Sequence, residues 1–212
     1  MHNCIYTAHC TEAICDKSCP ILVETSYLLE RNGITFANPV FSAPIDKVRK
    51  MLKVLELADG RFSVYKIDPD ETTIQSSDLL TYCAICKYWK GSRLHCNVYN
   101  LKYSKYIDEL KKTWNGTPES ENLQYMKIWS ESAKVLIVSN FDYVNFSDYE
   151  SQAMLNLIQQ RQSQGLTTVL VSPQIGMLVS SKKSSFFDML AKMMSMNIIK
   201  LPSGSEMGGV KS

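Results

Sequence analysis

Two short apolar runs in the second half of the chain predict buried strands. They lie at 134–140 and 167–172, and each is bounded by polar residues, as is typical of parallel strands covered on both faces. Between them, apolar residues recur at helical spacing over 148–161 while polar residues, the last of them Arg161, interleave, which predicts an amphipathic helix. Ser147 stands where it can cap the start of that helix. Strand, helix and strand together predict a right-handed βαβ unit.

The same patterns predict elements on both sides of this unit. The predicted strands are 61–67 and 94–100, and the predicted helices are 21–33, 46–57, 78–90, 104–114, 121–129 and a methionine-rich segment at 186–196. The polar stretch 68–77 is expected to be a loop, and the Gly- and Ser-rich residues from 203 onward a mobile tail. Because strands alternate with helices, we expect an α/β fold with a mostly parallel sheet and helices on both faces.

Composition is that of an ordinary globular protein. The chain has 212 residues, enough for one large domain with a small appendage, and 45% of them are hydrophobic and 21% charged. The net charge of +2 argues against a dominant role in nucleic-acid binding. No apolar run has membrane-spanning length, and the first residues lack the pattern of a signal peptide. We therefore expect a soluble, cytoplasmic protein without membrane contacts.

Four of the seven cysteines crowd the N-terminus. Cys4, Cys10, Cys15 and Cys19 have too little apolar sequence between them to form a core, whereas a metal ion would cross-link the segment. The spacing is similar to a CCCH zinc finger with Cys19 as the last ligand, and Cys15-x3-Cys19-Pro20 is also similar to the end of a ferredoxin-type iron–sulfur motif. We favour Zn²⁺, with an iron–sulfur cluster as the alternative that a brown colour would reveal. Unliganded cysteines in a mobile leader are the third interpretation.

A second metal site has a weaker basis. Cys83 and Cys86 lie three residues apart on a predicted helix, and His95 and Cys96 follow them. Free cysteine is among the most buried residue types, so we favour core packing for Cys83 and Cys86.

Aromatic and basic side chains raise the question of nucleic-acid contacts. The aromatic set is Trp89, Trp114, Trp129, Tyr99, Tyr103, Tyr106 and Tyr125. Such rings can stack on single-stranded bases, but packing between helices and a sheet is their more common role. The basic set is Lys102, Lys105, Lys111 and Lys112. A solvated helix face is the favoured interpretation of these lysines. The helix at 186–196 is expected to be the last core helix, a partner-binding face, or both.

The order of elements over 60–202 resembles the AAA+ domain of the bacterial and phage replicative helicase-loader family, the DnaC/DnaI type, which also includes transposition helper ATPases. In that family the first strand runs into a phosphate loop and helix, a later strand ends in acids that hold Mg²⁺, and a sensor strand completes the core. The resemblance implies an AAA+-like P-loop fold with three layers, a parallel sheet between helices on both faces.

The residues that handle nucleotide in that family are absent from this sequence. A phosphate loop needs glycines and a lysine, but 68–77 has neither and carries three acidic residues. Of the phosphate-loop motif, only Ser76 and Ser77 correspond to its final Ser or Thr position. The strand that ends in Mg²⁺-binding acidic residues in that family ends here in Ser139-Asn140. These degenerate positions predict a pseudo-ATPase that binds no ATP, since the fold alone does not supply the activity.

The predicted organisation has four parts. They are a small metal-stapled helical N-terminal domain at 1–38, a linker and helix at 39–59, the degenerate AAA+-like domain at 60–202 and the flexible tail at 203–212. In the helicase-loader family the N-terminal domain docks on the replicative helicase, while the AAA+ part self-associates and meets single-stranded DNA.

By this resemblance we expect a non-catalytic adaptor or inhibitor. Its expected partner is a replicative helicase, a helicase loader or another AAA+ ATPase of a phage or mobile element, with single-stranded DNA as a further candidate. Two alternatives stay open. One is an active ATPase with a rebuilt site, using Lys66 or Lys90 for phosphate and Asp142 for Mg²⁺. The other is a zinc-finger-type protein whose N-terminal segment binds single-stranded nucleic acid.

Overall fold

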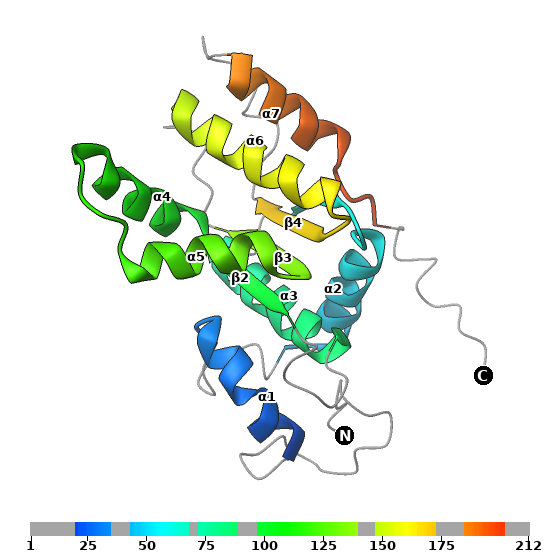
Figure 1. Cartoon of the computed structure of the whole chain (residues 1–212). Helices are drawn as coiled ribbons and strands as arrows, with labels where there is room; N and C mark the ends of the chain where they lie inside the picture. The colour runs from blue at the N-terminus through cyan, green and yellow to red at the C-terminus, as the bar shows by residue number, and fades with distance from the viewer. Residues whose placement is uncertain are drawn as a thin grey trace, which may run out of the picture.

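A computed structural model describes residues 20–34, 43–67, 72–88, 97–139, 147–172 and 185–201 (Figure 1). The strands are β1 (Phe62–Lys66), β2 (Val98–Lys102), β3 (Val135–Ser139) and β4 (Thr167–Ser172). The helices are α1 (Pro20–Arg31), α2 (Ile45–Leu57), α3 (Thr73–Tyr88), α4 (Tyr103–Lys112), the 3₁₀ turn η3 (Thr113–Asn115), α5 (Glu121–Ser132), α6 (Asp148–Ser163) and α7 (Ser185–Met196). Over these ranges no helix combines the length and apolarity that crossing a bilayer requires.

The four strands form one parallel sheet in the order β1-β4-β3-β2. A short segment after α7 adds to the outer side of β1, where Val64 bridges Ile198 in parallel. The Val64 N–H donates to the Asn197 carbonyl at 2.8 Å, and the Ile199 N–H donates to the Val64 carbonyl at 2.9 Å. The predicted parallel α/β fold is therefore confirmed.

Helices cover both faces of the sheet, and each face has its own buried cluster. Alternate residues along a strand point to opposite faces, so in β1 Tyr65 packs with α1, α2 and α3, whereas Phe62 and Val64 pack with α4, α5, α6 and α7. Figure 1 shows α6 and α7 on one side of the sheet and α2 and α3 on the other. The predicted three-layer arrangement is confirmed.

The predicted βαβ unit is β3, α6 and β4. The two strands are parallel neighbours, with Leu136 paired to Thr168. Ser147 caps α6 as predicted: its Oγ accepts from the Glu150 N–H at 3.3 Å, and the Glu150 carboxylate accepts from the Ser147 N–H at 2.7 Å. Gly165 follows the helix with a φ of +64°, a conformation that glycine adopts without strain.

Several predicted element bounds differ from those in the structure by two residues or more; α5, for example, ends at Ser132 and not at Trp129. Helix α3 begins at Thr73 and not at Asp78, because Thr72 caps it: the Thr72 Oγ1 accepts from the Gln75 N–H at 3.2 Å. The hydroxyl-rich residues that follow are typical of a loop, yet they form the first turn of α3, which is buried from Ser76 to Cys86. Strand β2 runs over Val98–Lys102 and so ends two residues beyond the predicted end at Asn100.

Arg161 is also placed differently from the expectation that it belongs to the polar residues of an amphipathic helix. It is fully buried. Its guanidinium donates to the Ser130 carbonyl at 2.8 Å, to the Thr167 carbonyl at 2.7 Å and to the Thr168 Oγ1 at 2.8 Å. Burial lowers its pKa to about 10, which leaves the group charged at neutral pH. Arg161 thus joins the end of α5, the end of α6 and the start of β4.

Helices α1 and α2 contribute to the same buried cluster as α3. Leu28 and Leu29 of α1 and Met51 and Leu55 of α2 are buried there. The proposed division of the chain at residues 38 and 59 stays a prediction, as does the character of residues 1–19, which lie outside the described ranges.

Candidate functional site

The carboxyl edge of the sheet between β1 and β4 is where this topology would bind a ligand. From β1 the chain crosses by α3, on one face, to β2 at the far end of the sheet. From β4 it crosses by α7, on the other face, to Ile198 beside β1. Neighbouring strands whose connections leave in opposite directions leave a crevice at their carboxyl ends, which is the usual ligand site of open α/β sheets.

The connector from β1 to α3 offers little to a phosphate at this edge. It consists of Ile67–Thr72 and contains neither glycine nor lysine. At its end the Thr72 side chain already accepts from one of the free N–H groups of α3. Such groups at a helix start are what holds phosphate in nucleotide-binding loops. The sequence of the connector also brings Asp68, Asp70 and Glu71, which repel a triphosphate.

Ser76 and Ser77, the predicted closing positions, lie inside α3 and are buried. The Ser77 Oγ donates to the Ile74 carbonyl at 2.9 Å, and so bonds within its own helix. Neither serine is at the start of the helix, where a phosphate-binding hydroxyl would have to stand.

The end of β3 is joined to α3 and β2 by buried side-chain hydrogen bonds. The Ser139 Oγ donates to the Asn100 Oδ1 at 3.1 Å, and the Asn100 Nδ2 donates to the Asp78 Oδ1 at 3.3 Å. All three side chains are buried, so each bond replaces one that water would otherwise make. A hydroxyl group therefore closes β3, where a nucleotide hydrolase would need a carboxylate for Mg²⁺. Asn140, the next residue, lies outside the described ranges.

This network, Asp78–Asn100–Ser139, extends to α1 through Asn32. The Asn100 N–H donates to the Asn32 Oδ1 at 2.7 Å, while the Asn32 Nδ2 donates to the Val98 carbonyl at 3.3 Å and to the Leu28 carbonyl at 2.7 Å. The carboxamide thus pairs with the outer edge of β2 as the peptide group of a further strand would, and it blocks that edge. Arg31 adds a hydrogen bond to the Val98 carbonyl at 3.0 Å and lies 4.0 Å from the centre of the Trp129 ring.

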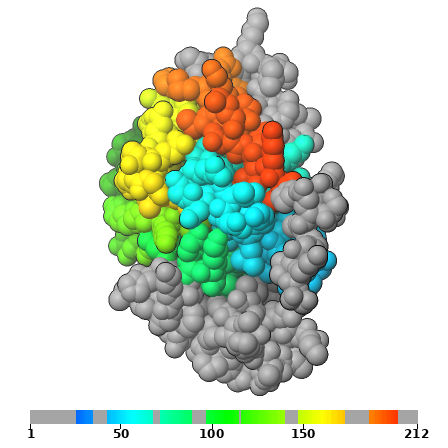
Figure 2. Space-filling model, turned by 90° about the vertical axis from the view of Figure 1, so that its right-hand side faces the viewer, coloured from blue at the N-terminus to red at the C-terminus, as the bar shows by residue number. Residues whose placement is uncertain are grey.

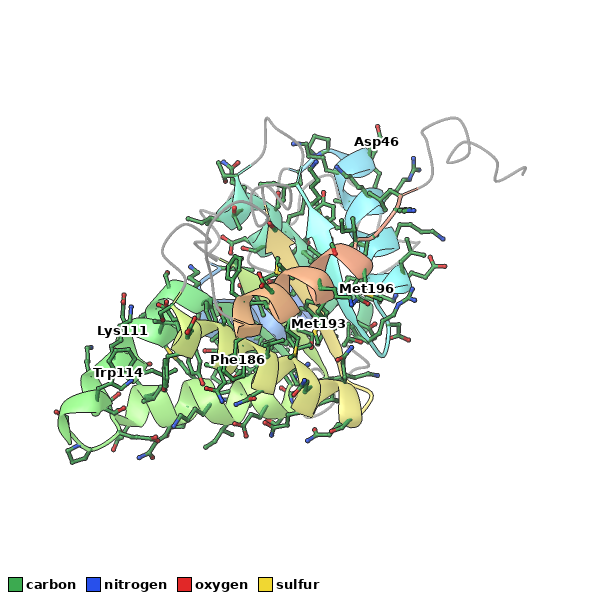
Figure 3. All side chains as sticks on the ribbon, turned by 90° about the horizontal axis from the view of Figure 1, so that it is seen from above. Asp46, Lys111, Trp114, Phe186, Met193 and Met196 are labelled. Carbon is green, nitrogen blue, oxygen red and sulfur yellow. The ribbon has the colours of Figure 1, made fainter. Side chains whose placement is uncertain are left out.

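A second candidate site is an exposed aromatic pair formed by Trp114 of η3 and Tyr149 in the first turn of α6. Figure 1 shows the α4–α5 hairpin, which carries Trp114, reaching away from the sheet. Trp114 is 53% exposed and Tyr149 42% exposed, and their ring centroids lie 4.9 Å apart in an edge-to-face arrangement. We call these two residues the aromatic platform. Figure 3 shows Lys111 near Trp114 at this end of the molecule.

Carboxylates neutralise the lysines beside the aromatic platform. Lys111 forms an ion pair with Glu150 at 3.0 Å, and Lys112 forms one with Glu109 at 2.5 Å. Burial raises the pKa of Glu150, but hydrogen bonds from Ser147 and Lys111 outweigh it and hold that pKa below its usual value. Two of the four predicted basic residues are therefore engaged within the chain. Exposed aromatics with balanced charge suit a protein partner better than a phosphate backbone.

The other aromatic residues divide between core and surface. Tyr103 is buried and donates its hydroxyl to the Glu150 carbonyl at 2.7 Å, and Tyr99 and Tyr106 are partly buried against the same core. Tyr125 on α5 is exposed. Trp89 lies outside the described ranges.

Cys83 and Cys86 are core residues, as the favoured interpretation predicted. Burial raises the pKa of Cys83 to about 12, so its thiol stays protonated and unreactive at neutral pH. Nowhere in the described ranges do three or more His, Cys, Asp or Glu residues gather as they would around a metal ion. The predicted N-terminal ligands fall outside those ranges, and so do His95, Cys96, Lys90 and Asp142. The predicted ligands are Cys4, Cys10, Cys15 and Cys19.

Sequence reasoning missed the network residues Asn32, Asp78 and Asn100. Asn32 lies at the end of the predicted helix 21–33, and nothing in that pattern indicates that it pairs with β2. A polar residue inside an otherwise apolar strand or helix is the one signal the sequence carries for Asn100 and Asp78, since buried polar groups need partners.

Neither a protein-family profile nor a curated protein matches this sequence. The solved structures that match include one described as the replication initiator DnaA bound to AMPPCP and single-stranded DNA. The identity is 11% and the TM-score 0.49, and the match covers 82% of this chain and 50% of the DnaA chain. This chain thus spans about half the length of that structure, and we draw nothing further from so distant a likeness. Its own parallel sheet between two helical layers is consistent with a P-loop, AAA+-like fold.

Proposed function

We propose that this protein is an AAA+-like binding module that does not hydrolyse ATP and acts as an adaptor or inhibitor of a replicative helicase, a helicase loader or a related ATPase of a phage or mobile element. The observation that carries this proposal is the chemistry of the carboxyl edge of the sheet. The fold keeps the strand order that puts a ligand site at this edge, but the connector from β1 to α3 lacks the residues that bind phosphate, and β3 ends in a hydroxyl group. A domain that keeps such a scaffold without its catalytic groups is useful through the contacts it makes.

The aromatic platform supports a macromolecular partner. Trp and Tyr are enriched among the residues that dominate binding energy at protein interfaces, and exposing two such rings to water without a partner is unfavourable. Because the neighbouring lysines are paired with carboxylates, we favour a protein over single-stranded DNA at this surface. In this proposal the N-terminal cysteines hold Zn²⁺, or alternatively an iron–sulfur cluster, in a small docking domain.

We expect the purified chain to release no phosphate from ATP above a buffer blank. The melting temperature should also be unchanged by ATP with Mg²⁺, because a ligand that does not bind cannot stabilise the folded state. Phosphate release that disappears in Lys66→Ala but persists in Lys105→Ala would instead establish the rebuilt ATPase site. Lys105→Ala is the matched control, since it removes an exposed lysine that follows β2, at the opposite end of the sheet from β1.

Trp114→Ala is expected to weaken a complex with the replicative helicase of the host by tenfold or more, about 2 kcal/mol, as truncation of an interface aromatic commonly does. The complex is measured by size-exclusion chromatography and titration with the purified helicase. Ile45→Ala, which truncates an exposed apolar residue at the start of α2, is the control and should leave affinity unchanged. Equal affinity of Trp114→Ala and the native chain would remove the aromatic platform from the proposal. Salt-sensitive binding of a labelled oligonucleotide that Trp114→Ala abolishes would assign the platform to single-stranded DNA.

A further inference from the structure

A small cleft lies at the amino end of β1, at the opposite end of that strand from the β1–α3 connector. The end of α2, the start of β1 and the segment after α7 line it, and its volume is about 270 Å³. The bridge between Val64 and Ile198 holds the segment in place. Figure 2 shows the residues after α7, in orange-red, beside the cyan surface of α2 and the turn into β1. This cleft is therefore separate from the candidate site at the carboxyl edge of the sheet.

Two cationic side chains line the cleft, and among the described residues no acidic one does. Arg61 and Lys200 are exposed, and neither forms an ion pair within the described ranges. The acidic residues that precede Arg61 are engaged elsewhere, since Glu56 forms an ion pair along its own helix and Asp59 accepts from a tyrosine hydroxyl. Within the described part of the chain, the cleft thus carries two positive charges without a counter-charge.

Arg61 is held at the cleft by a residue that also lines it. The Arg61 Nε donates to the Leu57 carbonyl at 2.7 Å, and the Arg61 Nη2 donates to the same carbonyl. Leu57 is the last residue of α2, so the helix itself leaves this carbonyl without a partner. A guanidinium has further N–H groups in a fixed planar arrangement, and those of Arg61 make no hydrogen bond to a described residue. They can donate to an anion.

Ser63 adds a hydroxyl group to the cleft. It is the second residue of β1, lines the cleft and is only 3% exposed. Its side chain makes no hydrogen bond to any residue in the described ranges. Hydroxyl groups of buried residues are normally hydrogen-bonded, so a polar ligand in the cleft would supply a bond that the described residues do not.

The rest of the wall is mostly apolar. Leu57, Met196, Ile198 and Ile199 contribute to it, and Met196 is 74% exposed. An inorganic ion would leave this apolar surface in water, whereas an organic group attached to the ion would cover it. The volume of the cleft is near the lower limit for small-molecule sites, so the ligand should be small.

We propose that this cleft binds a small organic phosphate monoester, with the phosphate group on Arg61, Lys200 and Ser63 and the organic group against the apolar wall. A phosphate monoester carries a charge of about −1.5 to −2 at neutral pH and three strong acceptor oxygens, which suit two cations and a hydroxyl group. A carboxylate carries a single charge and would leave one cation without a counter-charge. This site goes beyond the proposed adaptor role, because it needs none of the residues that are missing at the carboxyl edge.

Titration of the full chain with phenyl phosphate, followed by the NMR shifts of its backbone amides, tests the proposal. The amides of Ser63, Ile198 and Lys200 should shift together with one Kd of about 1 mM, as is usual for a ligand of so few atoms. Inorganic phosphate and phenol each supply one half of this ligand and should bind about tenfold more weakly or less.

The decisive variants change exposed residues, so they should leave the melting temperature unchanged. Lys200→Gln should weaken phenyl phosphate about tenfold, because one charge-assisted hydrogen bond is lost. Met196→Ser should weaken phenyl phosphate but not inorganic phosphate, since it removes only apolar wall. Lys192→Gln is the matched control, because it removes an exposed lysine of α7 that does not line the cleft, and its affinity should equal that of the native chain.

Four results would overturn the proposal. The first is phenyl phosphate that does not saturate the chain even at tens of millimolar. The second is equal affinity of Lys200→Gln and Lys192→Gln, and the third is inorganic phosphate that binds as tightly as phenyl phosphate. The fourth is a 5′-phosphorylated oligonucleotide that binds more tightly than phenyl phosphate and weakens steeply with salt, which would assign the cleft to nucleic acid.

Discussion

Replacing Arg161 with methionine is expected to lower the free energy of unfolding by about 3–5 kcal/mol, because several buried hydrogen-bond acceptors lose their donor at once. The aliphatic part of the side chain is kept, but the Ser130 and Thr167 carbonyls and the Thr168 hydroxyl lose their buried donor. Each orphaned acceptor has been removed from water without a replacement bond. Since a domain of this kind has a total stability of about 5–15 kcal/mol, the variant should be close to unfolding.

Urea unfolding followed by circular dichroism measures the loss as a lower transition midpoint. Arg49→Met is the matched control. Arg49 is exposed and forms only an i, i+3 ion pair with Asp46, so the same substitution there should change stability by less than about 0.5 kcal/mol. Arg161→Lys should fall between the two, because one ammonium group cannot reach acceptors arranged around a guanidinium. Equal midpoints for Arg161→Met and Arg49→Met would show that Arg161 does not hold α5, α6 and β4 together.

Arg161 also marks the limit of what hydrophobic patterning predicts. The pattern identified β3, α6 and β4 because strands buried on both faces are almost wholly apolar and the helix between them repeats its apolar residues. It assigned Arg161 to the polar side, since a charged residue is rarely buried unless it has partners. Those partners are the Ser130 carbonyl at the end of α5 and two groups at the start of β4, the Thr167 carbonyl and the Thr168 hydroxyl. A pattern read along α6 contains no information about groups on other elements.

The early start of α3 has a similar cause. Thr, Ser and Gln between Thr72 and Ser77 favour turns when considered alone, because their side chains compete for backbone hydrogen bonds. In the fold the Thr72 side chain caps the helix and the Ser77 hydroxyl bonds back to the Ile74 carbonyl, so the same chemistry supports a helix. Ser76 and Ser77 are buried in the fold, where a polar group needs a hydrogen-bond partner within the protein, and burial is a tertiary effect.

For the candidate site, the sequence predicted only which nucleotide-binding residues are missing. The lack of glycine and lysine after β1 and the Ser139 ending of β3 follow from the sequence once the strands are assigned. The hydrogen-bonded side chains found at the end of β3 could not be predicted in the same way. Asp78, Asn100 and Asn32 come from three separate parts of the chain. Their meeting depends on the strand order, in which β2 lies at the edge beside α1 and β3 lies next to it.

The chain of hydrogen bonds from Asn32 to Ser139 connects α1, which directly follows the predicted metal segment, with the carboxyl edge of the sheet. Asn32→Ala should therefore have two consequences. The free energy of unfolding should fall by about 2 kcal/mol, because the Val98 carbonyl and the Asn100 N–H lose a buried partner. The edge of β2 should also open, since the carboxamide is what pairs with it.

Hydrogen–deuterium exchange distinguishes this local opening from a general loss of stability. In Asn32→Ala the Asn100 amide and the amides of α1 should exchange faster than the lower free energy of unfolding alone would explain. The amides of β4, which lies inside the sheet, should exchange faster only by the amount that the lower free energy of unfolding explains. Asn156→Ala, at an exposed position of α6, is the control and should leave both regions unchanged. Uniformly faster exchange across α1, β2 and β4 would mean that Asn32 contributes only stability. An Asn100 amide as protected as in the native chain would mean that Asn32 does not close the sheet edge, and α1 would then be held by Leu28, Leu29 and the contact of Arg31 with Trp129.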